Sequence, residues 1–108
     1  MDKLAIVRSR LAKLDKPRFE DGTYVTEWWV VGSPVRGKRF QLQATLFDPS
    51  KARTWTKKVS FGAPGADTFI DHGDEVRRAN FHSRFAKTIA ATKSNPFAPM
   101  TLSAKLLW

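Results

Sequence analysis

The chemically richest stretch of this chain is a short segment in which acids and histidines stand close together. Within twelve residues it places both histidines of the chain among three carboxylates: Asp71, His72, Asp74, Glu75 and His82. A histidine beside carboxylates has the raised pKa that suits a general base. Two histidines with carboxylates are also common ligands of a metal ion. This acid–histidine segment is therefore the first candidate for catalysis or metal binding.

The spacing of these residues argues against both chemistries. Helix neighbours that face together are three or four residues apart, whereas His72 and His82 are ten apart. The chain has no cysteine for a disulfide or a thiolate ligand, and it has no Gly-x-Ser-x-Gly nucleophile motif. We therefore predict a protein that is not an enzyme, with no catalytic residue, metal ligand, cofactor or small-molecule substrate.

A structural role explains the same residues. Asp71 or Asp74 can begin a helix as its N-cap, and His72 can form a hydrogen bond in the turn. The spacing of Asp74 to Arg77 and Arg78 favours ion pairs on a helix. Gly62 and Gly65, which precede this segment, could in principle bind a phosphate through their backbone N–H groups. That role is disfavoured, because the lysine of a phosphate-binding loop is missing and four acids follow. We call the predicted structural set the clasp: Gly62, Gly65, Asp71, His72, Asp74, Arg77, Arg78 and Arg84.

Basic and aromatic residues interleave in the first half of the chain. The net charge is +9, and residues 36–58 hold seven Lys or Arg against one acid. Arg53, Trp55 and Lys57 alternate, so they share one face of a strand. On that face Trp55 can stack a base while the cations hold phosphates, as in single-strand binders. The alternative is that Trp55 belongs to the core and the lysines line an exposed strand.

The predicted surface for nucleic acid or another partner is wider than this strand. Arginines and lysines of two neighbouring turns add charge, and tryptophans add large apolar groups that can fill a partner pocket. The predicted binding set is Trp28, Arg36, Lys38, Arg39, Lys51, Arg53, Trp55, Lys57, Lys58 and Trp108. No signature of sequence-specific nucleic-acid readout accompanies it.

The elements that position these residues are expected to form one α+β domain over 1–108. Leucine and valine at steps of three and four predict an amphipathic helix over 1–17, which Pro17 ends. A long helix over 71–93 is expected to pack on the sheet, and a short helix over 100–108 can be capped by Thr101. No apolar run approaches the roughly 18 residues of a membrane span, and residues 1–16 lack the apolar centre of a secretory signal.

Three strands joined by short turns predict an antiparallel meander over 23–61. The strands are expected at 23–31, 38–47 and 54–61. The second has the cleanest alternation, which is typical of a strand with one buried and one wet face. In the first, strict alternation puts Trp29 on the face of Val25 and Val31, and Trp28 on the opposite face with Val30.

Residues 57–85 and the end of the chain resemble a family of small, uncharacterised proteins of large double-stranded DNA viruses, of the phycodnavirus and mimivirus kind. The resemblance is carried by Lys58, Phe61-Gly62, Gly65, Asp67-Thr68, His72, Asp74, Arg77-Arg78, Phe81, Arg84 and the closing Leu106-Leu107-Trp108. Phe85 departs from the pattern, which more often has histidine at this position. That departure removes one candidate ligand.

The resemblance implies a viral origin, a fold of three strands and helices, and no known enzyme activity. It favours a structural virion protein: a minor capsid, cement or internal component that contacts other virion proteins or itself. Such a protein is expected in the virion and, during assembly, in the host cytoplasm or nucleus. The charge and the Arg53–Trp55–Lys57 face keep a second hypothesis open, a non-sequence-specific nucleic-acid-binding accessory protein.

Overall fold

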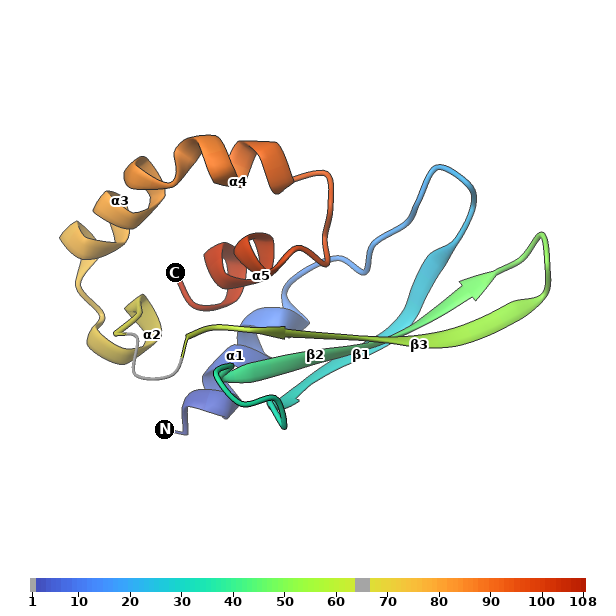
Figure 1. Cartoon of the computed structure of the whole chain (residues 1–108), viewed down its shortest axis with the longest axis horizontal. Helices are drawn as coiled ribbons and strands as arrows, with labels where there is room; N and C mark the ends of the chain where they lie inside the picture. The colour runs from blue at the N-terminus through green and yellow to red at the C-terminus, as the bar shows by residue number, and fades with distance from the viewer. Residues whose placement is uncertain (1, 64–66) are drawn as a thin grey trace.

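An antiparallel meander of three strands forms the centre of the fold (Figure 1). The strands are β1 (Tyr24–Gly32), β2 (Phe40–Asp48) and β3 (Arg53–Phe61), in the sheet order β1-β2-β3. They are seen in a computed structural model that describes residues 2–63 and 67–108. The predicted meander and the α+β class are confirmed.

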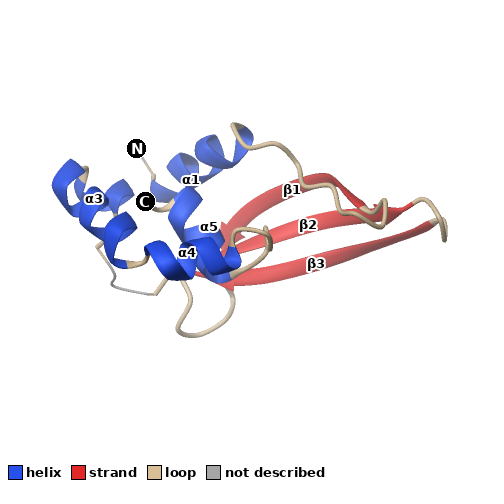
Figure 2. Cartoon of the chain, turned by 90° about the horizontal axis from the view of Figure 1, so that it is seen from above, coloured by secondary structure: helices blue, strands red, loops and turns tan. Residues whose placement is uncertain are grey.

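The core lies between one face of this sheet and two helices that are far apart in the sequence. Alternate residues of β2 are buried on that face: Phe40, Leu42, Ala44 and Leu46. Helix α1 (Lys3–Ala12) packs on β1, and α5 (Pro99–Leu106) packs on β3. Full burial of each leucine or valine contributes about 1.5–3 kcal/mol. The helices gather at one end of the molecule, and the strands extend beyond them at the other (Figure 2).

A bulge in β1 changes the predicted faces of this strand. Val25 pairs with Leu46, but the next pair is Glu27 with Thr45, so Thr26 is an extra residue. After a bulge the simple alternation of side chains no longer holds. Trp28 therefore shares the core face with Val25, whereas Trp29 lies on the opposite face and is 51% exposed. The expectation that Trp29 and Val25 share a face was wrong.

Three helices replace the single helix that was expected over 71–93. They are α2 (Phe69–His72), α3 (Glu75–Arg84) and α4 (Ala86–Thr92). Gly73 ends α2 in the left-handed conformation, with a φ of 66°. Phe85, with φ −103° and ψ 15°, separates α3 from α4. None of the residues of α3 and α4, all of which the structure describes, is buried, and α4 packs on α5.

The last helix, α5, begins differently from the prediction. Its N-cap is Ala98, followed by Pro99 in the first turn, where proline fits well. The Thr101 hydroxyl does not cap the helix but donates a hydrogen bond of 2.9 Å to the carbonyl of Thr92, which ties α5 to α4. Among the residues that the structure describes, no helix has the length and apolar character to cross a membrane.

Candidate nucleic-acid interface

Where the strands extend past the helices, the core face of the sheet opens into a groove of about 470 Å³. Its lining combines aromatic, apolar and basic side chains, and we call it the basic–aromatic groove: Phe19, Leu46, Lys51, Arg53, Trp55, Lys57 and Phe97. Two short acids, Asp21 and Asp48, also reach it. Strand residues supply the base of this groove, and two loops supply Phe19 and Phe97, whose rings stack with centroids 6.0 Å apart.

The β3 part of the groove is arranged as the alternation predicted. Arg53, Trp55 and Lys57 pair with Asp48, Leu46 and Ala44 of β2, so they share the face that carries the core. Trp55 is half-buried and packs against the core, whereas Arg53 and Lys57 are exposed. One part of the Trp55 ring is therefore buried against the core, and the rest is exposed to the groove.

Each cation of this face lies over an aromatic ring. The guanidinium carbon of Arg53 is 5.3 Å from the centroid of the Trp55 ring, and the Lys57 ammonium is 5.5 Å from that of Phe97. Such cation–π contacts contribute only about 0.5–1 kcal/mol at exposed sites. A ligand that offers a stacking ring and a negative charge can therefore displace the cations from the rings at small cost.

Arg53 and Lys57 form no ion pair within the described ranges, although Asp48 is the cross-strand neighbour of Arg53 and lies near Lys51. The ion pairs found there are Arg39–Asp71, Arg77–Asp67 and Arg78–Glu75. Asp48 accepts hydrogen bonds from the hydroxyl and the backbone N–H of Ser50, at 2.7 and 3.0 Å, and the hydroxyl is the main cause of its lowered pKa. Asp21 accepts from the N–H of Thr23 at 2.9 Å. The acids serve the turns, so Arg53 and Lys57 are free to bind an anion.

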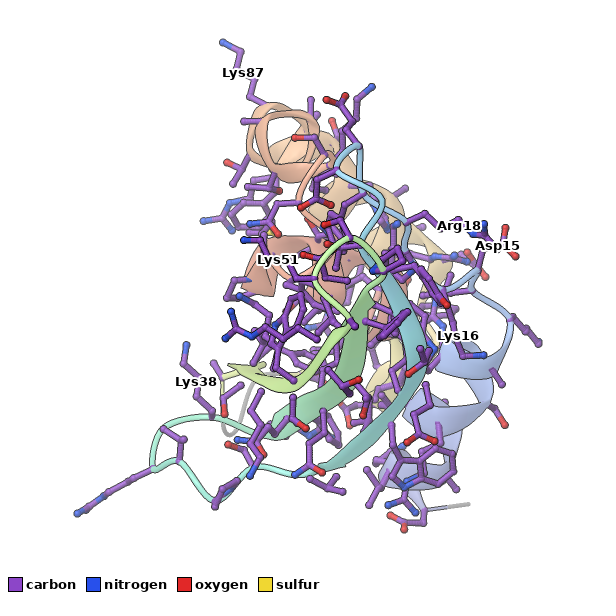
Figure 3. The ribbon with its side chains drawn as sticks, turned by 90° about the vertical axis from the view of Figure 1, so that its right-hand side faces the viewer. Asp15, Lys16, Arg18, Lys38, Lys51 and Lys87 are labelled. Carbon is purple, nitrogen blue, oxygen red and sulfur yellow. The ribbon has the colours of Figure 1, made fainter. Side chains whose placement is uncertain are left out.

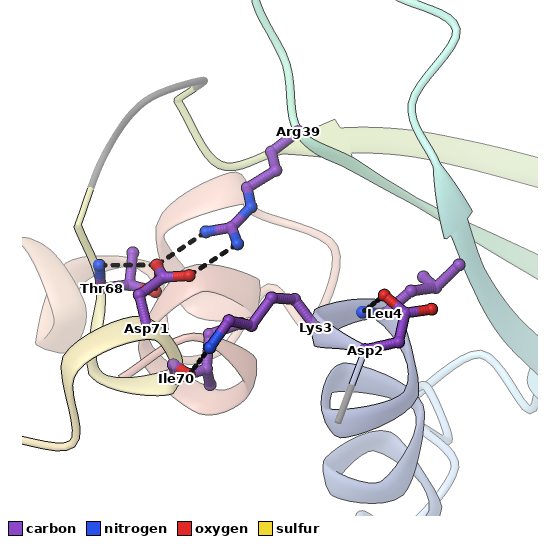
Figure 4. Close-up of polar contacts among 7 residues, drawn as sticks. All are labelled: Asp2, Lys3, Leu4, Arg39, Thr68, Ile70 and Asp71. Carbon is purple, nitrogen blue, oxygen red and sulfur yellow. Dashed lines mark hydrogen bonds and ion pairs between the residues drawn. The ribbon is translucent and has the colours of Figure 1, made fainter.

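Arg39, in contrast, is bound within the protein. Its guanidinium donates to both oxygens of Asp71, at 2.8 and 2.7 Å, and the Asp71 carboxylate also accepts from the N–H and hydroxyl of Thr68 (Figure 4). The Arg39 guanidinium holds the pKa of Asp71 well below its usual range. The N-cap of α2 is Thr68. Asp71 is the third residue of that helix and forms a capping box with Thr68, so it is not itself an N-cap. We assign Arg39 to the clasp and remove it from the binding set.

The rest of the clasp is partly as predicted. Asp74 is the N-cap of α3 and accepts from the N–H groups of Val76 and Arg77. His72 accepts a hydrogen bond of 2.8 Å from the N–H of Asp74, as expected for a turn. The predicted pairs of Asp74 with Arg77 and Arg78 were wrong, because these arginines pair with Asp67 at 2.9 Å and Glu75 at 3.8 Å.

The conformation of Gly62 explains why glycine occupies this position of the clasp. Gly62 has a φ of +82°, and a Cβ there would stand 3.2 Å from the Leu107 side chain and 3.3 Å from that of Arg39. Backbone and space both favour glycine at this position. Gly65 lies outside the described residues. In the part of the chain that the structure describes, no three His, Asp or Glu side chains lie close enough to hold a metal ion.

The remaining predicted binding residues are scattered. Arg36 and Lys38 are exposed in the β1–β2 turn, at the end of the sheet that the helices cover (Figure 1). Lys58 pairs with Gln43 on the face opposite the groove, and Trp28 packs against the core. Only four of the predicted set meet in the groove: Lys51, Arg53, Trp55 and Lys57. Sequence reasoning missed Phe19 and Phe97, since loop positions have no periodicity to reveal them.

The comparison with protein families gives one match. A model of a family of unknown function, DUF5754, matches residues 30–85. No curated protein and no solved structure matches the chain. The matched residues run from β1 to the C-cap of α3, so they include the clasp and the β3 part of the groove but neither Phe19 nor Phe97. Because the match covers more than half of the 108 residues, the chain belongs to the DUF5754 family.

Proposed function

We propose that this protein binds single-stranded nucleic acid, without sequence specificity, in the basic–aromatic groove. One observation carries the proposal: Arg53 and Lys57 stand over the Trp55 and Phe97 rings without carboxylate partners in the described ranges. A base that stacks on Trp55 displaces the Arg53 guanidinium, which then binds the adjoining phosphate. Stacking of this kind contributes about 1–3 kcal/mol per base.

The position of Trp55 favours a single strand over a duplex. The indole is half-buried in the floor of the groove, so only a base that has left its own stack reaches the ring. Bases in a duplex stay stacked, and a duplex offers a basic surface mainly its phosphates. The net charge of +9 adds attraction toward either form at low salt.

Titration of a labelled random-sequence DNA strand, followed by fluorescence anisotropy over a range of salt concentrations, tests this proposal. We expect Trp55→Leu to weaken binding about tenfold, which corresponds to the loss of one stacked base. Arg53→Ala should lower the slope of log affinity against log salt by about one. Arg36→Ala removes the same charge from the β1–β2 turn and is the matched control, so it should bind like the wild type.

Two results would overturn the proposal. The first is the absence of single-strand binding by the wild type at physiological salt. The second is an equal loss of affinity in Arg53→Ala and Arg36→Ala with no loss in Trp55→Leu, which would assign binding to overall charge. A duplex that competes as well as a single strand would contradict the preference for an unstacked base.

We also propose a setting for this activity, an internal structural component of the virion of a large DNA virus that contacts other virion proteins. The sequence resemblance supports this setting. Mass spectrometry of purified particles tests the setting, and absence of the protein from them would overturn it.

A further inference from the structure

A second arginine–aromatic couple lies at the C-terminal end of α3, where α3 meets α4 on the helical side of the molecule (Figure 1). Here the guanidinium carbon of Arg84 is 5.2 Å from the centroid of the Phe85 ring. Arg84 is exposed and forms no ion pair with any residue that the structure describes. The couple therefore has the same chemistry as Arg53 and Trp55 in the groove.

The couple belongs to one stripe of α3. Arg77, Asn80, Phe81, Arg84 and Phe85 recur at steps of three and one, which places them on one side of the helix. With Trp108 they line a pocket of about 490 Å³, the α3 pocket. Trp108 stacks on Phe81 with centroids 4.3 Å apart and rings 1° from parallel, so one wall of the pocket is a fixed pair of rings.

This stripe contributes little to the core. None of the ten residues of α3, every one of them described, is buried. An aromatic stripe on such a helix would be expected to fill the interior, yet the Phe85 ring is only partly buried, between the Phe81 ring at 4.9 Å and Arg84. Asp67 is the carboxylate of the pocket, and it is paired with Arg77 at 2.9 Å. The positive charge of Arg84 is thus left for a ligand.

We propose that the α3 pocket is a second contact for the same nucleic-acid strand, so that one strand contacts both the groove and the α3 pocket. A base takes the face of Phe85, and Arg84 moves from the ring to the phosphate beside it. The inference rests on the proposed function of the groove and adds a site to it. Helix α4 joins the two sites, because it follows Phe85 and leads to Asn95 and Phe97 of the groove.

Two lysines support a path along α4. Lys87 and Lys93 are exposed, and Lys87 projects away from the body of the molecule (Figure 3). Both can hold phosphates between the two stacking sites without fixing any base. Helix α4 has seven residues and is therefore about 10 Å long, so a strand near the upper limit of the roughly 4–16 nucleotides that one single-strand-binding domain covers reaches both sites.

A strand that reaches both sites gains affinity because its second contact is intramolecular. A comparison of the affinities for short and long strands therefore distinguishes the contribution of each site. The experiment is a titration of oligothymidylates of about 4 and about 16 nucleotides, the limits of that range, followed by fluorescence anisotropy. The proteins are the wild type, Arg84→Ala, Arg53→Ala and the control Arg36→Ala, with circular dichroism to confirm that each folds.

We expect Arg84→Ala to weaken the long strand about tenfold and to leave the short strand unchanged, whereas Arg53→Ala should weaken both. Phe85→Leu should act like Arg84→Ala. If Arg84→Ala binds the long strand as the wild type does, or weakens both lengths equally, the second site is overturned while the groove stands. If Arg53→Ala weakens neither length, the proposed function of the groove fails instead.

Discussion

Positively charged side chains at the two ends of the sheet have different partners. At the helix-covered end, arginine and lysine side chains bind the protein itself: Arg39 pairs with Asp71, Lys3 donates to the carbonyl of Ile70 at 2.9 Å, and Arg10 donates to that of Leu106 at 3.2 Å. At the groove end, Arg53 and Lys57 lie over aromatic rings and form no ion pair within the described ranges. The positively charged side chains therefore differ in their roles from one end of the sheet to the other.

The difference follows from the elements that are present at each end. Helices meet the sheet at one end and bring carbonyl groups and a carboxylate within reach of long cationic side chains. The groove end consists of strands, turns and loops, and its acids are engaged in the local hydrogen bonds of turns. We infer that Arg39, Lys3 and Arg10 hold the fold at the helix-covered end, and that Arg53 and Lys57 bind the ligand at the groove end.

The largest effect is expected from removal of the clasp carboxylate. Asp71→Ala leaves the half-buried Arg39 without its partner. It also removes the carboxylate that accepts hydrogen bonds from the N–H and hydroxyl of Thr68. Loss of one partner of a buried pair costs about 3–5 kcal/mol, and since both side chains keep some exposure we expect about 2–3 kcal/mol. Urea denaturation measures this free energy of unfolding. A loss below about 0.5 kcal/mol, the range of ordinary surface substitutions, would break the contrast between the two ends.

The adjacent tryptophans of β1 test how far the core extends along the sheet. Trp28→Ala removes a ring that packs against the core, and we expect a cost of about 2 kcal/mol, below the 3–5 kcal/mol of fully buried rings. Trp29→Ala removes a ring that is 51% exposed, so its cost should stay under about 1 kcal/mol. Thermal unfolding of the two variants compares them directly. The reverse order would contradict the assignment of Trp28 to the core face and of Trp29 to the opposite face.

Acid should weaken the helix-covered end first. The folded-state pKa of Asp71 lies below its unfolded value, so its contribution to stability is present above the unfolded value of about 4 and is lost as pH falls below it. We expect the free energy of unfolding to fall by about 1–2 kcal/mol more in the wild type than in Asp71→Asn between pH 5 and pH 2, because only the wild type has this carboxyl to protonate. Parallel curves for the two proteins would contradict this assignment.

The smallest effect on stability is expected at the groove end. Arg53→Ala and Lys57→Ala each remove an exposed cation that has no ion pair among the described residues. Their free energies of unfolding should stay within about 0.5 kcal/mol of the wild type, while binding of single strands falls. A loss of stability near that of Asp71→Ala would show that these cations also hold the fold.

The sheet could be predicted from the sequence because its strands are short and alternate cleanly. The alternation of β2 and the turn at residues 48–51 predicted the meander. The period of two on β3 predicted correctly that Arg53, Trp55 and Lys57 share one face. The bulge at Thr26 has no comparable signal, so the faces of Trp28 and Trp29 were interchanged relative to Val25. One inserted residue is enough to move every later side chain to the other face.

Long-range contacts account for the rest of the differences. Arg39 and Asp71 are 32 residues apart, and nothing local to either residue indicates that they meet. Phe19 and Phe97 come together from loops near the two ends of the chain. The division of 71–93 into separate helices did have a local signal, because Gly73 between His72 and Asp74 is a stop followed by an N-cap.

The four tryptophans allow the most direct test, since one lies in each region: Trp28 in the core, Trp29 on the open face of the sheet, Trp55 in the groove and Trp108 in the α3 pocket. The measurement is the ¹⁵N–¹H spectrum of the four indole groups during titration with oligothymidylates. We predict that a short strand shifts the Trp55 signal and leaves those of Trp28 and Trp29 in place, and that a long strand also shifts Trp108. A shift of Trp29 with no change at Trp55 would contradict the claim that the groove is the binding site.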